Sequence, residues 1–206
     1  MIQGTEEWLL ERCGKVTASR IADVVAKTRS GWGASRANYM AQLIVERLTG
    51  KPVETYQNQA MVWGIETEPQ ARAWYEFTTN MKVEEVGFIR HPSIDMSGAS
   101  PDGLVCDHGL LEIKCPNSAT HIDFLLTGVI PDKYIKQMQW QMACTGREWC
   151  DFVSYDPRMP TELQAKVVRV FRNSDMIGCL EKDVIEFLTE VDQKVDKLAN
   201  MMTVVC

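Results

Sequence analysis

The sequence predicts a mixed α/β (α+β) fold in which a mixed β-sheet is flanked by helices. Two observations predict it: apolar residues recur at helical spacing towards both ends of the chain, and strand-like segments separated by turn residues occupy the middle. The chain has 206 residues, 45% of them hydrophobic, which is enough for one sizeable core and too few for two comfortable domains. We therefore expect a single domain over residues 1–206.

The amino-terminal part of the chain is predicted to be mainly helical. Apolar residues at helical spacing indicate four helices, over residues 5–13, 17–27, 36–48 and 66–79. Thr17 or Ser19 would cap the second helix, and Pro69 stands near the start of the fourth, where a missing N–H is tolerated. The polar, glycine-containing residues 28–35 are predicted to form a loop.

The remainder of the chain changes to strand-like patterns. Alternating apolar residues bounded by turn residues indicate five strands, over residues 83–92, 97–106, 109–116, 149–155 and 165–172. One helix is expected over residues 132–145, ended by Gly146, and a long one over residues 174–200. The apolar side chains of the last helix share one side and predict its buried face: Val184, Phe187, Leu188, Val191, Val195 and Leu198.

The charge of the chain is unevenly distributed. Its formal net charge of -6 argues against a protein that coats nucleic acid through a global basic excess. Basic residues nevertheless outnumber acids between Arg12 and Arg36, and acids outnumber lysines between Asp175 and Lys197. A molecule polarised in this way could present a basic groove to phosphates while its acidic side faces away.

Cysteines, histidines and apolar runs exclude several classes of protein. The seven cysteines are an odd number without a CxxC pair, and the three histidines show no metal-ligand spacing, so neither a disulfide framework nor a zinc site is indicated. No apolar run reaches the roughly 18 residues of a membrane span. The first residues, MIQGTEEWLL, lack the basic-then-apolar order of a signal peptide. We expect a cytoplasmic protein without a membrane partner.

One short stretch, SPDGLVCDHGLLEIKCP, places charged residues in an apolar hairpin. Residues 107–109 are expected to form a three-residue loop with Gly109 in the left-handed conformation. That loop pairs Cys106 with Leu110, Leu104 with Glu112 and Asp102 with Lys114. Paired residues share a face, so Asp102, Glu112 and Lys114 would converge, whereas a two-residue loop would separate the two acids.

Charges in a half-buried strand are costly unless they are paired or bind a metal. Two carboxylates without an adjacent imidazole or thiolate suit Mg²⁺ or Mn²⁺, and a lysine beside them can stabilise a developing anion. These are the components of metal-assisted phosphodiester hydrolysis. The alternative is a solvated hairpin whose Glu112 and Lys114 are surface charges.

The same residues resemble the PD-(D/E)xK nuclease superfamily, as Pro101-Asp102 followed by Glu112-Ile113-Lys114. More specifically, the chain resembles the lambda-exonuclease-like (viral-type alkaline exonuclease) family. The resemblance runs from Trp8 to the last helix and includes, in order, the stretches KVTASR, VWGIETEPQA, SPDGL, EIKCP and SYDPRMP. It implies a restriction-endonuclease-like core.

The resemblance also implies an activity and its partners. Members of this family digest one strand of double-stranded DNA processively, from 5′-phosphorylated ends and in the 5′-to-3′ direction, with Mg²⁺ as cofactor. The 3′ single strand that remains would serve recombination with a single-strand annealing protein. We accordingly expect Mg²⁺ as the cofactor, with Mn²⁺ as a possible substitute. We also expect the protein to form a homotrimer ring around DNA, and to be a phage or prophage protein that acts in a bacterial host cell.

Roles at the metal site follow from the same resemblance. Asp102, Glu112 and the backbone carbonyl of Ile113 would bind Mg²⁺, and Lys114 would position or activate the attacking water. Glu68 matches a family acid near the metal, but would otherwise be an ordinary first-turn glutamate stabilised by the helix dipole. Gln137 matches an active-site glutamine of the family. It could equally form, with Gln141 one turn later, a polar stripe on a helix.

Contacts to DNA are implied for a second group of residues. Arg12 would hold the 5′-phosphate with Ser19 and Ser100 nearby, since guanidinium grips phosphate bidentately and hydroxyls donate single bonds. Otherwise Arg12 would be a surface arginine and Ser19 a helix cap. Arg29 would contact the DNA backbone or be a mobile surface arginine, and Met61 would part the strands at the duplex end or be buried in the core.

Other functions remain as alternatives. A structure-specific or restriction-type endonuclease of the same superfamily would have an identical hairpin and would cut closed circular DNA. A non-catalytic DNA-end-binding module would bind ends without cleaving them, although its carboxylates would then repel phosphate. A superfamily branch with an iron-sulfur cluster is disfavoured because the cysteines near the carboxyl end are not clustered.

Overall fold

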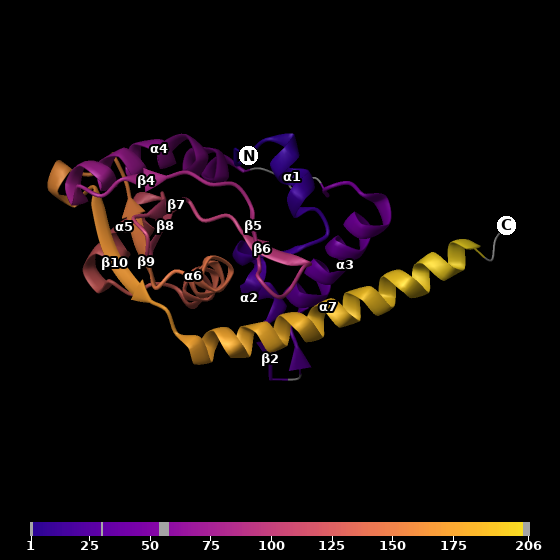
Figure 1. The fold of residues 1–206 in the computed structure, drawn as a ribbon. Coiled ribbons are helices and arrows are strands. Elements are labelled where there is room, and N and C mark those ends of the chain that lie inside the picture. Colours follow the sequence, from indigo (N-terminus) through magenta and orange to yellow (C-terminus); the bar gives the residue numbers. More distant parts are fainter. Residues whose placement is uncertain (1, 30, 54–57, 204–206) are drawn as a thin grey trace.

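The computed structural model describes residues 2–29, 31–53 and 58–203 (Figure 1). Its largest sheet has five strands in the order β10-β9-β8-β7-β4. These strands are β4 (Val83–Glu84), β7 (Gly103–Val105), β8 (Gly109–Lys114), β9 (Trp149–Tyr155) and β10 (Ala165–Phe171). β8 and β9 are parallel and the other neighbours are antiparallel, so the sheet is mixed, as predicted.

Two smaller sheets complete the strand content of the described residues. One has the order β1-β6-β5, and the other is a short hairpin of β2 and β3. Their bounds are β1 (Val16–Thr17), β2 (Lys27–Thr28), β3 (Gly31–Trp32), β5 (Ile89–Arg90) and β6 (Ser97–Ala99). The parallel pairing of β1 with β6 joins segments that are far apart in the sequence.

The helices surround these sheets. The α-helices are α1 (Glu6–Arg12), α2 (Ile21–Val24), α3 (Ala34–Thr49), α4 (Gln59–Thr79), α5 (Ser118–Thr127), α6 (Asp132–Thr145) and α7 (Ser174–Thr203), with the 3-10 turns η1 (Ala18–Arg20) and η2 (Thr161–Leu163). α3 and α6 end at Gly50 and Gly146, both in the left-handed conformation that a glycine adopts without strain. The predicted stop of α6 at Gly146 is confirmed.

The five-stranded sheet is covered on both faces by helices. Ala71 and Tyr75 of α4 pack with Val105, Leu111 and Ile113 on one face. The other face packs against α5 and α6 through a cluster that contains Leu110, Phe124, Met138, Met142, Cys150 and Phe152. Residues 118–145, which form α5 and α6, make the crossover that the parallel pair β8–β9 requires.

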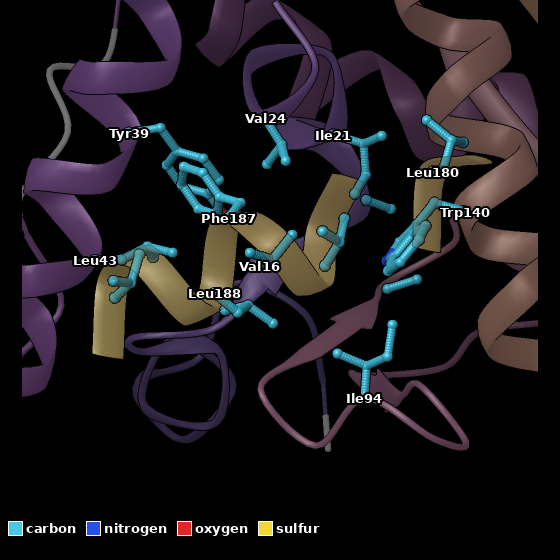
Figure 2. Close-up of a cluster of buried hydrophobic side chains, with 14 of the residues drawn as sticks. Val16, Ile21, Val24, Tyr39, Leu43, Ile94, Trp140, Leu180, Phe187 and Leu188 are labelled. Atoms are coloured by element: carbon cyan, nitrogen blue, oxygen red, sulfur yellow. The ribbon is translucent and has the colours of Figure 1, made fainter. Parts of the chain in front are cut away.

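A second core lies between α2, α3, α6 and α7 (Figure 2). Tyr39 of α3 stacks on Phe187 of α7 with ring centroids 5.8 Å apart. The predicted buried face of α7 is correct as far as Val195, which is half-buried against this core, but Leu198 is 40% exposed. Figure 1 shows the reason: the carboxyl-terminal part of α7 extends beyond the body of the chain.

Several predicted boundaries are wrong in the amino-terminal part. Only Ile21–Val24 of the expected helix over 17–27 is α-helical, because Val16 donates its N–H to Met96 O at 2.9 Å and the chain leaves this strand through η1. Thr17 precedes η1 without a side-chain cap bond. The expected loop over 28–35 contains parts of the β2–β3 hairpin.

Other boundaries shift for local reasons. α4 starts at Gln59, where the side chain of Asn58 accepts a hydrogen bond from Met61 N at 3.0 Å, so Pro69 lies inside the helix. The expected strands 83–92 and 97–106 are each divided between two sheets, the second around Pro101, which has no N–H to donate. α5 was not predicted, although Asn117 caps its start and Gly128 ends it.

Part of the basic segment at residues 12–36 is neutralised inside the fold. Arg36 is buried and forms a bidentate ion pair with Glu190 of α7, at 2.8 and 3.1 Å. Arg20 is paired with Asp23. The segment as a whole therefore does not form a basic groove, because two of its arginines are paired with acids.

None of the helices in the described part of the chain has the length and apolar composition that crossing a membrane would require.

One buried acid is expected to contribute measurably to stability. Asp156, directly after β9, accepts hydrogen bonds from Ser118 Oγ at 2.6 Å and from Arg158 Nε at 2.7 Å. Burial disfavours the charged carboxylate, but these hydrogen bonds outweigh it and lower the pKa of Asp156 to about 2. Since the pKa is depressed on folding, the charge stabilises the fold above about pH 4 and this gain is lost as the pH falls towards 2.

Asp156→Asn is thus expected to lower the free energy of unfolding by about 2 kcal/mol at pH 7. The difference from the wild type should shrink between pH 4 and pH 2. Urea unfolding at pH 7 and pH 3 measures it, with Asp123→Asn on the exposed side of α5 as the control. Equal stability of Asp156→Asn and wild type at pH 7 would contradict the assignment.

Candidate active site

The β7–β8 hairpin differs from the predicted register by two residues but keeps its parity. Its pairs are Gly103 with Leu111, Leu104 with Leu110 and Val105 with Gly109. The loop is therefore residues 106–108, and the left-handed residue is Cys106, at φ 47°, where Gly109 was expected. Gly109 is needed in the strand, because a Cβ there would lie 2.1 Å from the ring of Trp149. Asp102, Glu112 and Lys114 still share one side of the hairpin.

Glu112 is the centre of a hydrogen-bonded cluster on the sheet face that packs against α6. It is fully buried. Its Oε1 atom accepts from the ammonium of Lys114 and from Gln137 Nε2, the latter at 2.7 Å. Its Oε2 atom accepts from Gln141 Nε2 at 2.6 Å. The side chain of Asp102 lies beside this cluster and accepts from Ile113 N through Oδ2 at 2.7 Å.

The charges of this cluster shift the pKa values of its members. Burial and the neighbouring charge of Glu112 raise the pKa of Asp102 well above its ordinary value. Burial also disfavours the ammonium of Lys114, but Glu112 and Asp102 outweigh it and raise the pKa of Lys114. Lys114 is therefore protonated at neutral pH, and one cation compensates two carboxyl groups.

The donors present fit a hard divalent cation. Mg²⁺ is typically bound through one or two carboxylates and keeps several waters. Asp102 and Glu112 line the same cavity, and Asp102 Oδ1 has no hydrogen-bond partner among the residues that the structure describes. Burial and the neighbouring negative charge together raise the pKa of Asp102, and a bound cation would relieve the repulsion between the two carboxylates. The described residues contain no cluster of three or more His, Cys, Asp or Glu side chains suited to a metal.

Glu68 lies on α4 and lines both of the grooves that adjoin this cavity. It lines one groove together with Asp102 and the other groove together with Lys114. Arg72, one turn later, holds it in an ion pair at 2.6 Å and also contacts Glu85 at 3.0 Å. Burial raises the pKa of Glu68, against the lowering effect of Arg72 and Lys114. The structure thus brings Glu68 close to the carboxylate cluster without a direct contact.

The cavity beside the carboxylates also holds the predicted phosphate-binding residues. It has a volume of about 190 Å³ and is lined by Arg12, Ser19 and Ser100 together with Asp102, Glu112, Lys114 and Gln137. Within the described ranges, the guanidinium of Arg12 has neither a hydrogen-bond partner nor an ion pair. Burial lowers the pKa of Arg12, although arginine stays charged at any physiological pH. A half-buried guanidinium without a hydrogen-bond or ion-pair partner in the described ranges, beside two hydroxyls, suits a phosphate.

Trp8 lines this cavity although the sequence did not predict a role for it. The indole of Trp8 donates a hydrogen bond from Nε1 to Ser100 Oγ at 2.9 Å, and its ring lies 3.9 Å below the guanidinium of Arg12. It therefore fixes two of the predicted phosphate-binding side chains at once. The available signal was the spacing of Trp8 and Arg12, which places both on one side of α1.

Met61 and Arg29 lie outside the cavity. Met61, in the first turn of α4, is 45% exposed and lines both adjoining grooves, so burial in the core is wrong for it. Arg29 is exposed in the β2–β3 turn and does not line the cavity. The structure therefore brings Met61 near the carboxylates and does not bring Arg29 there.

Comparison with known proteins gives close structural relatives. The family model of the YqaJ-like viral recombinase domain matches residues 7–148. The crystal structure of an alkaline exonuclease, LHK-Exo, from Laribacter hongkongensis is 51% identical, with a TM-score of 0.92 over 98% of this chain and 100% of that chain. A crystal structure of LHK-Exo in complex with dAMP is similar to the same extent.

A more distant structure agrees on the fold. A phage-related exonuclease from Haemophilus somnus 129PT is 13% identical, with a TM-score of 0.71 over 89% of this chain and 96% of that chain. No similar sequence is found among curated proteins. The restriction-endonuclease-like core that the resemblance implied is confirmed. The chain belongs to the family of YqaJ-like viral recombinase domains.

Proposed function

We propose that this protein is a Mg²⁺-dependent DNA exonuclease that digests one strand of a duplex in the 5′-to-3′ direction from 5′-phosphorylated ends. One observation carries the proposal: the carboxylate–lysine cluster and the unpaired guanidinium of Arg12 line the same small cavity. The 51% identity to an alkaline exonuclease over nearly the whole chain supports the reaction class.

The residues of the cluster have distinct roles in this proposal. Asp102, Glu112 and the carbonyl of Ile113 would hold Mg²⁺, which when bound neutralises charge on the scissile phosphate and acts as a Lewis acid. Lys114, kept protonated by its neighbours, would donate a hydrogen bond to the attacking water or to the oxygen on which charge develops. Gln137 would hold Glu112 from the cavity side, and Glu68 would orient water in the adjoining groove.

The shape of the cavity favours cleavage from an end. Arg12, Ser19 and Ser100 offer donors for a phosphate within the same 190 Å³ that the carboxylates line. A terminal phosphate can enter such a pocket, whereas the interior of a duplex presents only bridged phosphates. The relative LHK-Exo has been crystallised with dAMP, a nucleoside monophosphate, which supports nucleotide binding by this protein. Met61 would part the strands, and Arg29 would contact the backbone farther away.

The family resemblance leads us to propose the biological setting as well. The 3′ single strand left by digestion would serve recombination by strand annealing, with a single-strand annealing protein as partner. The protein would form a homotrimer ring around DNA and accept Mn²⁺ as a substitute for Mg²⁺. It would act in the cytoplasm of a bacterial cell as a phage or prophage protein. Size-exclusion chromatography with light scattering tests the trimer independently of activity.

A single assay tests the reaction. Linear duplex DNA labelled on one strand, with either 5′-phosphate or 5′-hydroxyl ends, is incubated in Mg²⁺ or in EDTA beside a closed circle. We expect loss of the 5′-phosphorylated strand in Mg²⁺ alone, with the circle intact. A nicked or linearised circle would make the protein an endonuclease, and bound ends without any product would make it a binding module.

A further inference from the structure

Glu112 is held by a second amide that the proposed reaction does not use. Gln141 lies one turn after Gln137 on α6 and is fully buried. Its Nε2 atom donates to Glu112 Oε2 at 2.6 Å. Unlike Gln137, it does not line the cavity, so it can touch neither DNA nor water there. Any effect of Gln141 on the reaction must therefore pass through Glu112.

The orientation of the Gln141 amide is determined by its two neighbours. A carboxylate only accepts hydrogen bonds, so the NH₂ group of Gln141 must face Glu112. Its carbonyl oxygen then faces the thiol of Cys150 on β9, with Sγ and Oε1 4.0 Å apart. Burial raises the pKa of Cys150 well above its ordinary value, so this thiol keeps the proton that it donates. The contacts form one chain from Cys150 through Gln141 to Glu112.

The two oxygens of Glu112 differ in what holds them. Oε1 contacts Lys114 and Gln137, which both line the cavity and are available to substrate and solvent. Oε2 contacts Gln141, which is inside the interface between α6 and the sheet. When Lys114 turns towards a bound phosphate, Gln141 would still hold the carboxylate in place. Of the donors to Glu112 in the described part of the chain, Gln141 is the one that does not line the cavity.

We propose that Gln141 is a positioning residue that fixes the orientation of Glu112 for the divalent cation, with Cys150 as its anchor. This inference rests on the proposed function, because it needs Glu112 to be a metal ligand. Hydrogen bonds to ligating carboxylates orient them, and their loss typically weakens metal affinity by 10- to 100-fold. Gln141 thereby sets the affinity for the cation and not the affinity for DNA.

The test is the substitution Gln141→Met, which keeps the length of the side chain and removes both polar atoms. Mn²⁺ binding is measured directly, by the electron paramagnetic resonance signal of free Mn²⁺, in protein without DNA. We expect the dissociation constant to rise by about 10-fold. In cleavage assays the Mg²⁺ concentration for half-maximal rate should rise by the same factor, while kcat at saturating Mg²⁺ and KM for DNA change little.

Gln139→Met is the matched control, because Gln139 is a buried glutamine of the same helix. Its side-chain amide donates a hydrogen bond to Phe171 O at 2.8 Å and accepts one from Asn173 N at 2.9 Å. Both contacts lie on the side of α6 away from Glu112. It is expected to lower the melting temperature without changing the affinity for Mn²⁺. Should Gln141→Met not fold, Cys150→Ala provides a second variant that leaves Gln141 in place. We expect it to weaken the affinity for Mn²⁺ by less than Gln141→Met does, and unchanged affinity would overturn the role of Cys150 as the anchor.

The outcomes separate the two proposals. If wild-type protein binds no Mn²⁺, the metal site of the proposed function fails, and this inference fails with it. If the wild type binds Mn²⁺ and Gln141→Met binds it equally well, the inference alone is overturned. Equal weakening by Gln139→Met would also overturn it, because the effect would then report the packing of α6 and not the contact with Glu112.

Discussion

Lys114→Ala is expected to lower the rate of DNA cleavage by about 10²- to 10⁴-fold while binding of DNA survives. The reason lies in the charges of the cluster. Among the residues that the structure describes, Lys114 is the one cation in contact with Glu112, and the carboxylates keep its ammonium protonated. An ammonium fixed at this place stabilises charge that develops in the transition state and adds little to the ground state, so its loss falls on kcat.

The measurement separates cleavage from binding. Cleavage is followed on the 5′-phosphorylated labelled duplex in Mg²⁺, and binding on a duplex with phosphorothioate linkages at its ends, which slow cleavage by the wild type. Lys133→Ala is the matched control, since Lys133 and Lys114 both approach the ring of Tyr134, at 4.7 and 5.2 Å, but only Lys114 reaches Glu112. Full activity of Lys114→Ala would remove the lysine from the chemistry.

The sequence predicted correctly those helices and strands whose ends are determined by neighbouring residues in the chain. The bounds of α6 and β9 agree with the prediction, because Gly146 stops the helix and the strand is apolar between polar neighbours. The helix expected over residues 17–27 failed because Val16 pairs with β6, a contact with a distant segment that no local pattern reports. Arg36 illustrates the same limit: its burial depends on Glu190, far along the chain.

The candidate site was predictable to the extent that it depends on strand parity. Asp102, Glu112 and Lys114 share a face whether the hairpin pairs as expected or two residues further along, because side chains alternate with a period of two. The contacts of Gln141 and Trp8 could not be predicted in this way. They depend on how α6 and α1 pack against the sheet and against Ser100, which is set by tertiary structure.

The second large effect is expected at Arg12. Arg12→Ala should lower the rate on 5′-phosphorylated ends by about 10- to 100-fold, because a charged hydrogen-bonding group contributes about 1.5–3 kcal/mol. The rate on 5′-hydroxyl ends should change little. Arg12 suits this role because its guanidinium faces the cavity, stacks on Trp8 and has no hydrogen-bond or ion-pair partner within residues 2–29, 31–53 and 58–203.

Arg20 provides the control for this prediction. It is another arginine of the same region, and its guanidinium also lies over an aromatic ring, that of Tyr39. Unlike Arg12, it is already satisfied by Asp23 and by Gln42, at 2.5 and 3.0 Å. Arg20→Ala should therefore affect phosphorylated and hydroxyl ends equally, so that the ratio of the two rates stays at the wild-type value.

The ratio of rates on the two ends also distinguishes a phosphate pocket from general electrostatic attraction. If Arg12 only attracted DNA, its loss would slow both substrates and the effect would diminish as salt increases. A contact with the terminal phosphate predicts a loss confined to phosphorylated ends at every salt concentration. An unchanged preference in Arg12→Ala would place the terminal-phosphate pocket elsewhere, and with it the reason why this cavity would select an end.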